Sequence, residues 1–500
     1  MTTQFMNLQK TFILILVAWY TLLNANAQSG FEKTYGGAKD DEAFYIQKTG
    51  VGGYIITGST SSTPAKEQDI YILKIDSKGN VAINSSLGWP NDDKGNCIQP
   101  TADGGYIIAG STQYSLDPKY YNNIHVKTNG NLTNIPWANF VLGQTNGNHA
   151  FNCVQLTNDG NFILTGTYEQ NFLTAITMLT KINAKTGDTI WTKFSKYRAN
   201  HWQDKGNSVI QTSDKGYLVG GQTLIILGND MNDHQATLMK TDSMGNIKWH
   251  KEYGTSKGSS MNDFDIQDCK EVIQASDGGF VLVGGSVQVN NGTVLPSTVY
   301  VIKTNANGDT IWTKRIKEGF NAGGNSIKQT ADGGYIVVGY TEINKDDKDV
   351  LLLRLDANGK KLWSKSFGGT KYDCGNSIQL TSEGGFILAG VTESKGLGGK
   401  DVYIVKTGAD GTTAVEKSEK NQANFLIAPN PSKGKFTVHL SDMETKGEIK
   451  IFDLSGRIVY TNLIMDSSAD IDLTSYRDGI YFVKLYSEGN TTVRKVVLQR

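Results

Sequence analysis

Three observations predict an all-β fold in two parts. A Gly-rich turn followed by an aromatic residue recurs seven times between residues 50 and 390. No segment combines sustained helical periodicity with helix caps, and the recurring pattern stops after residue 413. Together these observations predict a seven-bladed β-propeller closed by the N-terminal strand, followed by a small Ig-like antiparallel β-sandwich.

The repeat is clearest where TADGGYIIAGST at 101–112 returns as TADGGYIVVGYT at 330–341. The aromatic residues that follow the turn are Tyr54, Tyr106, Phe162, Tyr217, Phe280, Tyr335 and Phe386. Their intervals are 52, 56, 55, 63, 55 and 51 residues. A period of this length is typical of a propeller blade rather than a solenoid coil.

Each repeat is predicted to hold four short strands, as the sixth copy illustrates. Its segments 325–330 and 335–341 flank an Asp-Gly turn, which suits a tight hairpin. Segments 349–356 and 361–369 flank a second turn, and β-branched and aromatic residues are frequent in these runs. The same turn and strand chemistry therefore solves the same packing problem in every repeat.

The two ends of the repeat array predict that the ring closes. The seventh repeat lacks a fourth strand, since Val415 stands where other repeats carry Trp363, Trp312 and Trp249. The missing strand matches the start of the chain, where FEKTYGGAKDDEA (31–43) aligns without gaps to WSKSFGGTKYDCG (363–375). Pairing 31–37 with 401–407 would cover two edges that an open array leaves bare.

The ends of the chain also carry processing and connecting segments. Residues 1–27 have the features of a signal peptide, with an apolar run and small residues before a cleavage site near Ala27. The propeller is expected over 28–413, a polar linker over 414–424 and the sandwich over 425–500. No second apolar run of membrane-spanning length follows the signal.

Composition narrows the classes of partner. Lys+Arg and Asp+Glu balance at 49 each, so the chain has no overall field to attract nucleic acid. Cys97 and Cys153 occupy equivalent repeat positions, which indicates small buried hydrophobes rather than a bridge. Tryptophans at one repeat position indicate packing between blades; they are Trp137, Trp191, Trp249, Trp312 and Trp363.

The tail carries a specific resemblance. PNPSKG at 429–434, IFDLSGRIVY at 451–460, DGIYFVKL at 478–485 and the basic pair Arg494–Lys495 occur in order and end at the C-terminus. This tail resembles the C-terminal sorting domain of the type IX secretion system of Bacteroidota. The alternative is a sandwich that simply caps the propeller. The candidate sorting-signal residues are Pro429, Asn430, Pro431, Gly434, Asp453, Gly456, Gly479, Tyr481 and Lys495.

The resemblance implies a route and partners. The N-terminal signal would direct passage through the inner membrane, and the type IX machinery would then recognise the tail and export the protein. A sortase-like peptidase would remove the tail, leaving the protein secreted or attached to the outer cell surface. The repeats also resemble Gly-rich propeller repeats carried by such surface proteins, which implies a fold and no activity.

Motifs for catalysis and cofactors are weak. A G-x-S-x-G match at 254–258 lies in a Gly/Ser loop with no helix after it, unlike a nucleophile elbow. The histidines show no HExxH spacing, no Cys pair is spaced for zinc, and no P-loop is present. The turn is similar to the Asp-box of sialidase-type propellers but lacks that family's arginine cluster. We expect no catalytic residue and no cofactor; a calcium ion is compatible with the carboxylates but has no motif.

One set of carboxylates recurs at a constant distance before the turns. The equivalent positions carry Asp41, Asp93, His149, Asp204, Gln267, Ala322 and Asp373. Asp41, Asp93, Asp204 and Asp373 are the candidate ligand-binding residues, because a ring of carboxylates near one channel mouth could bind a cation or a glycan. The alternative is that each aspartate ties loop backbone at a blade junction.

Three functions follow from these patterns. The leading hypothesis is a non-catalytic binding or adhesion module for glycan or extracellular protein, with the insertions at 223–235 and 287–298 as candidate binding loops. The second is a glycan-acting hydrolase or lyase with its site at the channel mouth. The third is a structural surface-layer protein.

Overall fold

The chain folds into two compact units, Met1–Ala414 and Val415–Arg500, described here in a computed structural model. The structure describes residues 30–500 apart from 51, 63–66, 117–118, 142–146, 170–173, 196–200, 227–231, 255–263, 345–346, 414–424, 441–446, 455, 465–467 and 488–489. The expected signal peptide, the linker, the loop at 255–258 and part of the insertion at 223–235 therefore lie outside the described residues. All regular secondary structure in the described ranges is β-strand, and none of it is a helix that could cross a membrane.

Four sets of strands recur through the first unit. The first set comprises β2 (Asp41–Lys48), β6 (Asp93–Pro100), β10 (His149–Leu156), β14 (His201–Gln211), β18 (Phe264–Gln267) with β19 (Glu271–Gln274), β24 (Asn321–Gln329) and β28 (Asp373–Leu380). The second comprises β3 (Tyr54–Thr60), β7 (Tyr106–Leu116), β11 (Phe162–Glu169), β15 (Tyr217–Ile226), β20 (Phe280–Asn290), β25 (Tyr335–Asn344) and β29 (Phe386–Thr392). Each first-set strand pairs antiparallel with the second-set strand that follows it.

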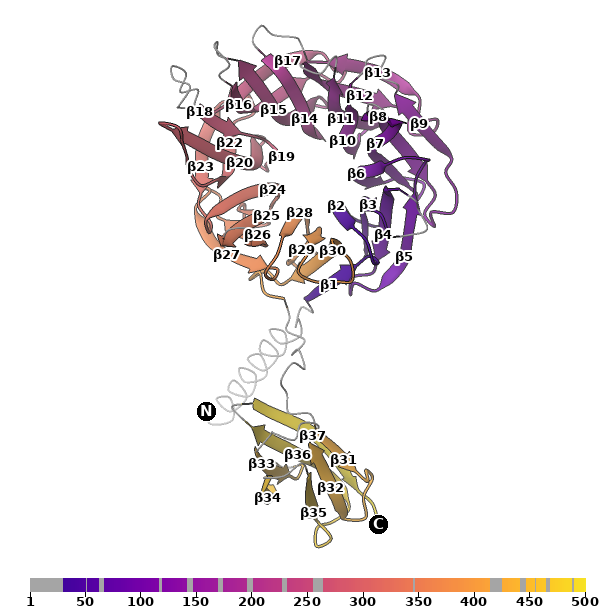
Figure 1. Cartoon of the computed structure of the whole chain (residues 1–500), viewed down its shortest axis with the longest axis vertical. Coiled ribbons are helices and arrows are strands. Elements are labelled where there is room, and N and C mark those ends of the chain that lie inside the picture. The colour runs from indigo at the N-terminus through magenta and orange to yellow at the C-terminus, as the bar shows by residue number, and fades with distance from the viewer. Residues whose placement is uncertain are drawn as a thin grey trace, which may run out of the picture. The chain divides into compact units, whose positions relative to one another are not determined.

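The other two sets complete each sheet. The third comprises β4 (Asp69–Ile75), β8 (Lys119–Thr128), β12 (Ala175–Ile182), β16 (Asn232–Thr241), β22 (Thr298–Thr304), β26 (Asp347–Leu355) and β30 (Asp401–Thr407). The fourth comprises β5 (Val81–Leu87), β9 (Trp137–Val141), β13 (Thr189–Phe194), β17 (Ile247–Tyr253), β23 (Thr310–Ile316), β27 (Lys361–Phe367) and β1 (Phe31–Tyr35). The insertion at 287–298 forms a hairpin, in which β21 (Thr293–Val294) pairs with β20. First-set strands other than β18 lie nearest the centre and fourth-set strands at the rim, a propeller-like arrangement (Figure 1).

The start of the chain completes the last sheet. Strand β1 pairs antiparallel with β30, from Phe31 opposite Lys406 to Tyr35 opposite Val402, so the sheet order is β1-β30-β29-β28. The predicted pairing of 31–37 with 401–407 is therefore confirmed over the strand that forms. Hydrogen bonds reach the next sheet as well, since Tyr35 Oη donates to the carbonyl of Gly79 at 2.7 Å.

Rim aromatics pack between neighbouring sheets. Ring centroids lie 5.9 Å apart for Trp191 and Tyr217, and 6.2 Å apart for Trp363 and Phe386. The predicted role of these tryptophans in packing between sheets is confirmed for these pairs. In the last sheet, Phe31 takes the place that a tryptophan takes in other sheets. A Cβ on Gly79 would come within 2.7 Å of the Phe31 ring, as one on Gly411 would come close to Trp363. Gly79 also has a φ of 76°, which favours glycine.

The second unit is formed by two antiparallel sheets over one apolar core. One sheet has the order β31 (Phe425–Ala428), β32 (Lys435–Leu440), β35 (Ser468–Asp472). The other has the order β34 (Ile458–Ile464), β33 (Gly447–Phe452), β36 (Gly479–Ser487), β37 (Asn490–Leu498). Phe425 and Val438 from the first sheet share a buried cluster with Ile451 and Val483 from the second.

Candidate functional site

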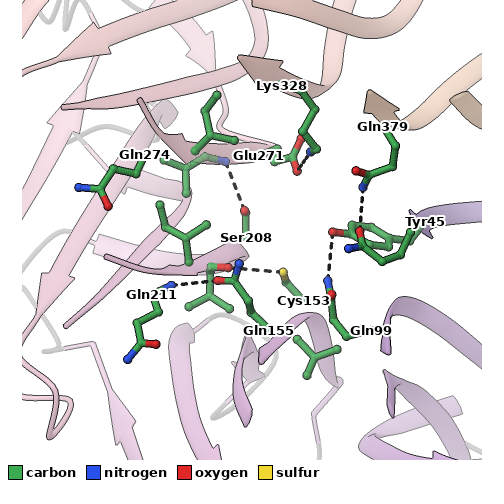
Figure 2. Close-up of a pocket in the computed structure, with 16 residues that line it drawn as sticks. Tyr45, Gln99, Cys153, Gln155, Ser208, Gln211, Glu271, Gln274, Lys328 and Gln379 are labelled. Carbon is green, nitrogen blue, oxygen red and sulfur yellow. Dashed lines mark hydrogen bonds and ion pairs between the residues drawn. The ribbon is translucent and has the colours of Figure 1, made fainter. Parts of the chain in front are cut away.

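The innermost strands of the first unit surround an open cavity of about 350 Å³, here called the hub cavity, which both polar and aliphatic side chains line. In Figure 2, Tyr45, Gln99 and Gln379 approach one another, whereas Gln211 and Gln274 point away from them. Six glutamines contribute to the lining: Gln47, Gln99, Gln155, Gln211, Gln274 and Gln379. Each glutamine stands six or seven residues before the aromatic residue of its repeat. These glutamines are not among the residues predicted from the sequence, although their recurrence beside the turn is a signal that could have found them.

A second cavity of about 530 Å³ borders the first. Tyr45, Cys153, Ser208 and Glu271 line both cavities. Asparagines replace glutamines as the recurrent amides of the second cavity; they are Asn96, Asn152, Asn207, Asn325 and Asn376. The centre of the unit therefore offers amide groups on both sides of these four shared side chains.

These asparagines are positioned by a β-bulge in each inner strand. Pairing of β6 with β7 skips from Gly95 to Cys97, so Asn96 is the extra residue, and its Nδ2 donates to the carbonyl of Phe151 at 2.9 Å. Asn152 and Asn325 make the same bond at 2.9 Å to the next inner strand. Asn207 makes it at 2.9 Å to the carbonyl of Cys269, which lies between β18 and β19. Asn376 closes the series, since its Nδ2 donates to the carbonyl of Ala43 at 2.8 Å. The asparagine of the D-x-G-N pattern thus joins adjacent sheets.

Two junctions lack this asparagine and use other groups. Phe44 stands at the bulge of β2, and there Tyr45 Oη accepts from Gln99 Nε2 at 3.4 Å. At the fifth repeat the Glu271 carboxylate accepts from the amide N of Ile327 at 2.7 Å and from Lys328 Nζ at 2.6 Å. These exceptions place a phenol, a carboxylate and an ammonium group at the hub cavity, which breaks its symmetry.

The four carboxylates predicted from the sequence lie outside both central cavities. Asp41, Asp93 and Asp373 have no exposed surface and Asp204 is 5% exposed, and none of them lines either cavity at the centre. Asp41 accepts from the amide N of Gly37 at 2.7 Å and Asp93 from that of Trp89 at 2.6 Å. Asp373 accepts from the amide N of Gly369 at 2.9 Å, and Asp204 from Ser195 Oγ at 3.2 Å. Their contacts tie the loops that enter each inner strand.

Each of three predicted aspartates faces a carboxylate from the third strand of the preceding sheet. The pairs are Asp401 with Asp41, Asp69 with Asp93, and Asp349 with Asp373. Burial raises the pKa of Asp93 to about 6, and Asp69 and Asp92 add to the rise. In the described part of the chain, no group of three or more His, Cys, Asp or Glu side chains is placed to hold a metal ion.

The candidate sorting-signal residues all lie in the second unit, where Asn430 contacts the segment that holds Lys495. Asn430 Nδ2 donates to the carbonyl of Lys495 at 2.8 Å, and its Oδ1 accepts from the amide N of Val497 at 2.9 Å. The PNPSKG segment is thereby bound to the last strand. Asp453 caps the turn at Gly456, whose φ is 83°, by accepting from the amide N of Arg457 at 3.1 Å. Other members have separate structural contacts: Tyr481 Oη donates to the carbonyl of Arg477 at 2.8 Å.

Comparison with known families identifies the second unit. Residues 426–499 match the family described as the secretion system C-terminal sorting domain. The unit is a type IX sorting domain, and it marks the chain for secretion to the cell surface. No curated protein sequence matches the chain significantly.

The solved structures that resemble this one share little sequence identity with it. PorZ, a surface component of the type IX secretion system of Porphyromonas gingivalis, is 12% identical with a TM-score of 0.43 over 93% of this chain and 60% of that chain. This chain thus spans about 60% of the length of PorZ. BamB from Moraxella catarrhalis is 12% identical with a TM-score of 0.38 over 75% of this chain and 100% of that chain. Puromycin hydrolase is 11% identical with a TM-score of 0.47 over 81% of this chain and 59% of that chain.

Proposed function

We propose that this protein is an exported binding protein whose hub cavity takes a neutral, hydrogen-bonding ligand, either a glycan or a segment of an extracellular protein. The observation that carries this proposal is the amide lining of the cavity. Glutamine side chains donate and accept hydrogen bonds without ionising, so they suit recognition of hydroxyl and peptide groups. Pockets with a few polar groups at fixed positions are the usual form of a ligand site.

The titratable groups of the hub cavity favour binding over catalysis. General acid–base chemistry needs groups that gain and lose protons near the working pH. Burial raises the pKa of Tyr45 well above its usual value, so its phenol stays neutral. The Glu271 carboxylate is held by Lys328, Ser326 and the backbone of Ile327. A hydrolase or lyase site would instead call for two carboxylates in the cavity, and Asp93, with its raised pKa, is not among the lining residues.

We infer that the sheets of the first unit are seven blades of a closed propeller. Support comes from the pairing order of the strand sets and from the bonds between the last and first inner strands. Asn376 Nδ2 donates to the carbonyl of Ala43 at 2.8 Å, and Gln379 Nε2 donates to that of Ile46 at 3.0 Å. The facing sheets of the second unit support an Ig-like sandwich.

The route to the surface forms part of the same proposal. A signal peptide over 1–27, cleaved near Ala27, would admit the chain to the periplasm of a member of the Bacteroidota. The machinery of type IX secretion would recognise the sorting domain, and a sortase-like peptidase would cut within the linker at 414–424. The propeller would then be released or held at the outer cell surface.

The test is an array of glycans and extracellular proteins probed with residues 28–413, with and without calcium. We expect capture of a ligand without turnover, and at least tenfold weaker binding for the double variant Gln47→Ala/Gln99→Ala. Gln329→Ala is the matched control, because this repeat glutamine lies outside the cavity lining and bonds the amide N of Ser276. Product formation that disappears in Asp93→Ala and Asp204→Ala would contradict the proposal and favour the enzyme hypothesis.

A further inference from the structure

Two thiols from neighbouring sheets meet beside the hub cavity. Cys97 on β6 and Cys153 on β10 each follow the bulge asparagine of their strand, and their Sγ atoms lie 3.9 Å apart. Bonds on either side hold the strands together: Asn96 Nδ2 donates to the carbonyl of Phe151 at 2.9 Å, and Cys97 Sγ to that of Val154 at 3.5 Å. A disulfide has an S–S distance of about 2.0 Å, so the two sulfurs need to approach by about 2 Å.

The two thiols differ in exposure. Cys97 has no exposed surface, whereas Cys153 is only partly buried and lines both central cavities (Figure 2). The hydrogen bond from Cys97 lowers the pKa of Cys153, while burial raises the pKa of Cys97. A reagent in the cavity therefore meets the Cys153 sulfur first, with Cys97 directly behind it.

We propose that Cys97 and Cys153 are a reactive dithiol that a small-molecule disulfide, entering through the hub cavity, oxidises to a disulfide between two sheets. The Cys153 thiolate attacks one sulfur of the reagent, forms a mixed disulfide and releases one thiolate. The Cys97 sulfur then attacks the Cys153 sulfur and expels the second thiolate, which takes up the proton that Cys97 gives up. The protein loses two electrons and two protons, and the reagent leaves as two thiols.

Oxidation would change both the cavity and the junction. The Cys153 sulfur would turn from the cavity lining toward Cys97, which alters the hub surface that a ligand meets. The new bond would also join the sheet that holds β6 to the sheet that holds β10. A cross-link between residues far apart in the sequence constrains the unfolded chain. Secretion favours this oxidation, since thiols outside the cytoplasm are not kept reduced. The sequence-based interpretation of both cysteines as small buried hydrophobes rather than a bridge would then be incomplete.

The test exposes the chain from residue 28 to oxidised glutathione under native conditions, followed by alkylation, intact mass measurement and peptide mapping. We expect a mass about 2 Da lower before alkylation, because two hydrogens leave with the reduced glutathione. Non-reducing peptide maps should contain a linked Cys97–Cys153 pair. The melting temperature should rise on oxidation and return after dithiothreitol.

Single variants distinguish Cys153, the thiol that reacts first with the reagent, from Cys97, the thiol that completes the disulfide. In Cys97→Ser, the mixed disulfide should persist, so Cys153 keeps one glutathionyl group. In Cys153→Ser, Cys97 should take up none, because it has no exposed surface. Cys269→Ser is the matched control: Cys269 is buried and its Sγ contacts the carbonyl of Glu271, so the Cys97–Cys153 bond should form as in the unaltered chain.

Two outcomes would overturn the proposal. In the first, Cys97→Ser accepts glutathione at Cys153 while the unaltered chain forms no internal bond, which would show that the sulfurs cannot meet. In the second, all four thiols of the unaltered chain stay alkylatable after prolonged exposure. The measurement on the unaltered chain decides the question even where a variant fails to fold.

Discussion

Aspartates of the first unit occupy two opposite environments. At the repeat turn, the hydrogen bond from Lys127 and then that from Thr101 lower the pKa of Asp103 to about 2. The Lys127 bond measures 2.6 Å, and equivalent turn aspartates bond lysines at 2.5 Å in Asp159–Lys181 and Asp277–Lys303. Asp93 instead has its pKa raised to about 6 by burial. One residue type therefore contributes to stability with opposite dependence on pH.

The pH dependence of Asp93 is the prediction at this scale. Its folded pKa of about 6 exceeds the ordinary value of 3.8, so its contribution to stability is fully present below pH 3.8 and is lost as pH rises through 6. Asp93→Asn imitates the protonated carboxyl. The melting temperature of Asp93→Asn should therefore equal that of the unaltered chain near pH 4 and exceed it increasingly toward pH 7, as measured by scanning calorimetry.

Asp103→Asn is the control for this experiment. Because the pKa of Asp103 is lowered to about 2, its contribution is present above pH 3.8 and is lost as pH falls toward 2. Asp103→Asn should lower the melting temperature by a constant amount between pH 4 and 7. A constant difference for Asp93→Asn over the same interval would contradict the burial argument.

At the scale of the element, the innermost strand is the unit that joins the sheets. Its bulge releases one residue from the ladder, and in five repeats that residue is an asparagine whose amide reaches the next strand. The bulge therefore converts a defect within one sheet into a bond between two. Tyr45 and Glu271 take over where the asparagine is absent, and both lie at the cavity.

Removing one of these amides should loosen one junction. Asn376→Ala removes the bond to Ala43 and leaves a carbonyl unpaired, which costs about 1 kcal/mol of stability and up to about 3 kcal/mol if that carbonyl is excluded from water. Hydrogen exchange should increase in β28 and β2 and remain unchanged in β10 and β14. Asn152→Ala is the matched variant, for which β10 and β14 should be affected instead. Equal changes at both junctions would refute a local role.

The strands and turns could be predicted from sequence because their determinants are local. Asp-Gly pairs specify the hairpins, and the alignment of Phe31 with Trp363 was sufficient to place β1 beside β30. The centre of the unit could not be predicted in the same way. Asn96 and the carbonyl that it bonds are 55 residues apart, and nothing near Asn96 in the sequence distinguishes this bond from an ordinary turn contact. The aspartate of D-x-G-N attracted attention because carboxylates are common ligands, yet the asparagine is the residue that reaches the cavity.

The two ends of the first unit are in contact with each other. Strand β1 supplies the edge of the sheet that holds β28 to β30, and Tyr403 Oη donates to the Glu32 carboxylate across 371 residues of sequence. Lys395 Nζ adds a bond to the same carboxylate at 2.6 Å. Without β1, strand β30 would expose unpaired backbone groups, which are a template for aggregation.

Truncation tests this dependence. A chain that begins at Gly37 lacks β1 and should melt at a lower temperature and form oligomers, as measured by light scattering after size-exclusion chromatography. A chain that ends at Thr413 lacks the sorting domain and should keep the oligomeric state and melting temperature that the first unit has in the unaltered chain, because that domain is a separate compact unit. A fully monomeric, equally stable chain from Gly37 onward would show that β1 is dispensable for closure.

The pairing of β1 with β30 has a consequence for biogenesis. The ribosome makes β1 hundreds of residues before its partner β30. The backbone groups of β1 therefore have no pairing strand until the last repeat has been translated. The export label is translated immediately afterwards. A product terminated before residue 401 would therefore lack both the partner strand of β1 and the sorting domain.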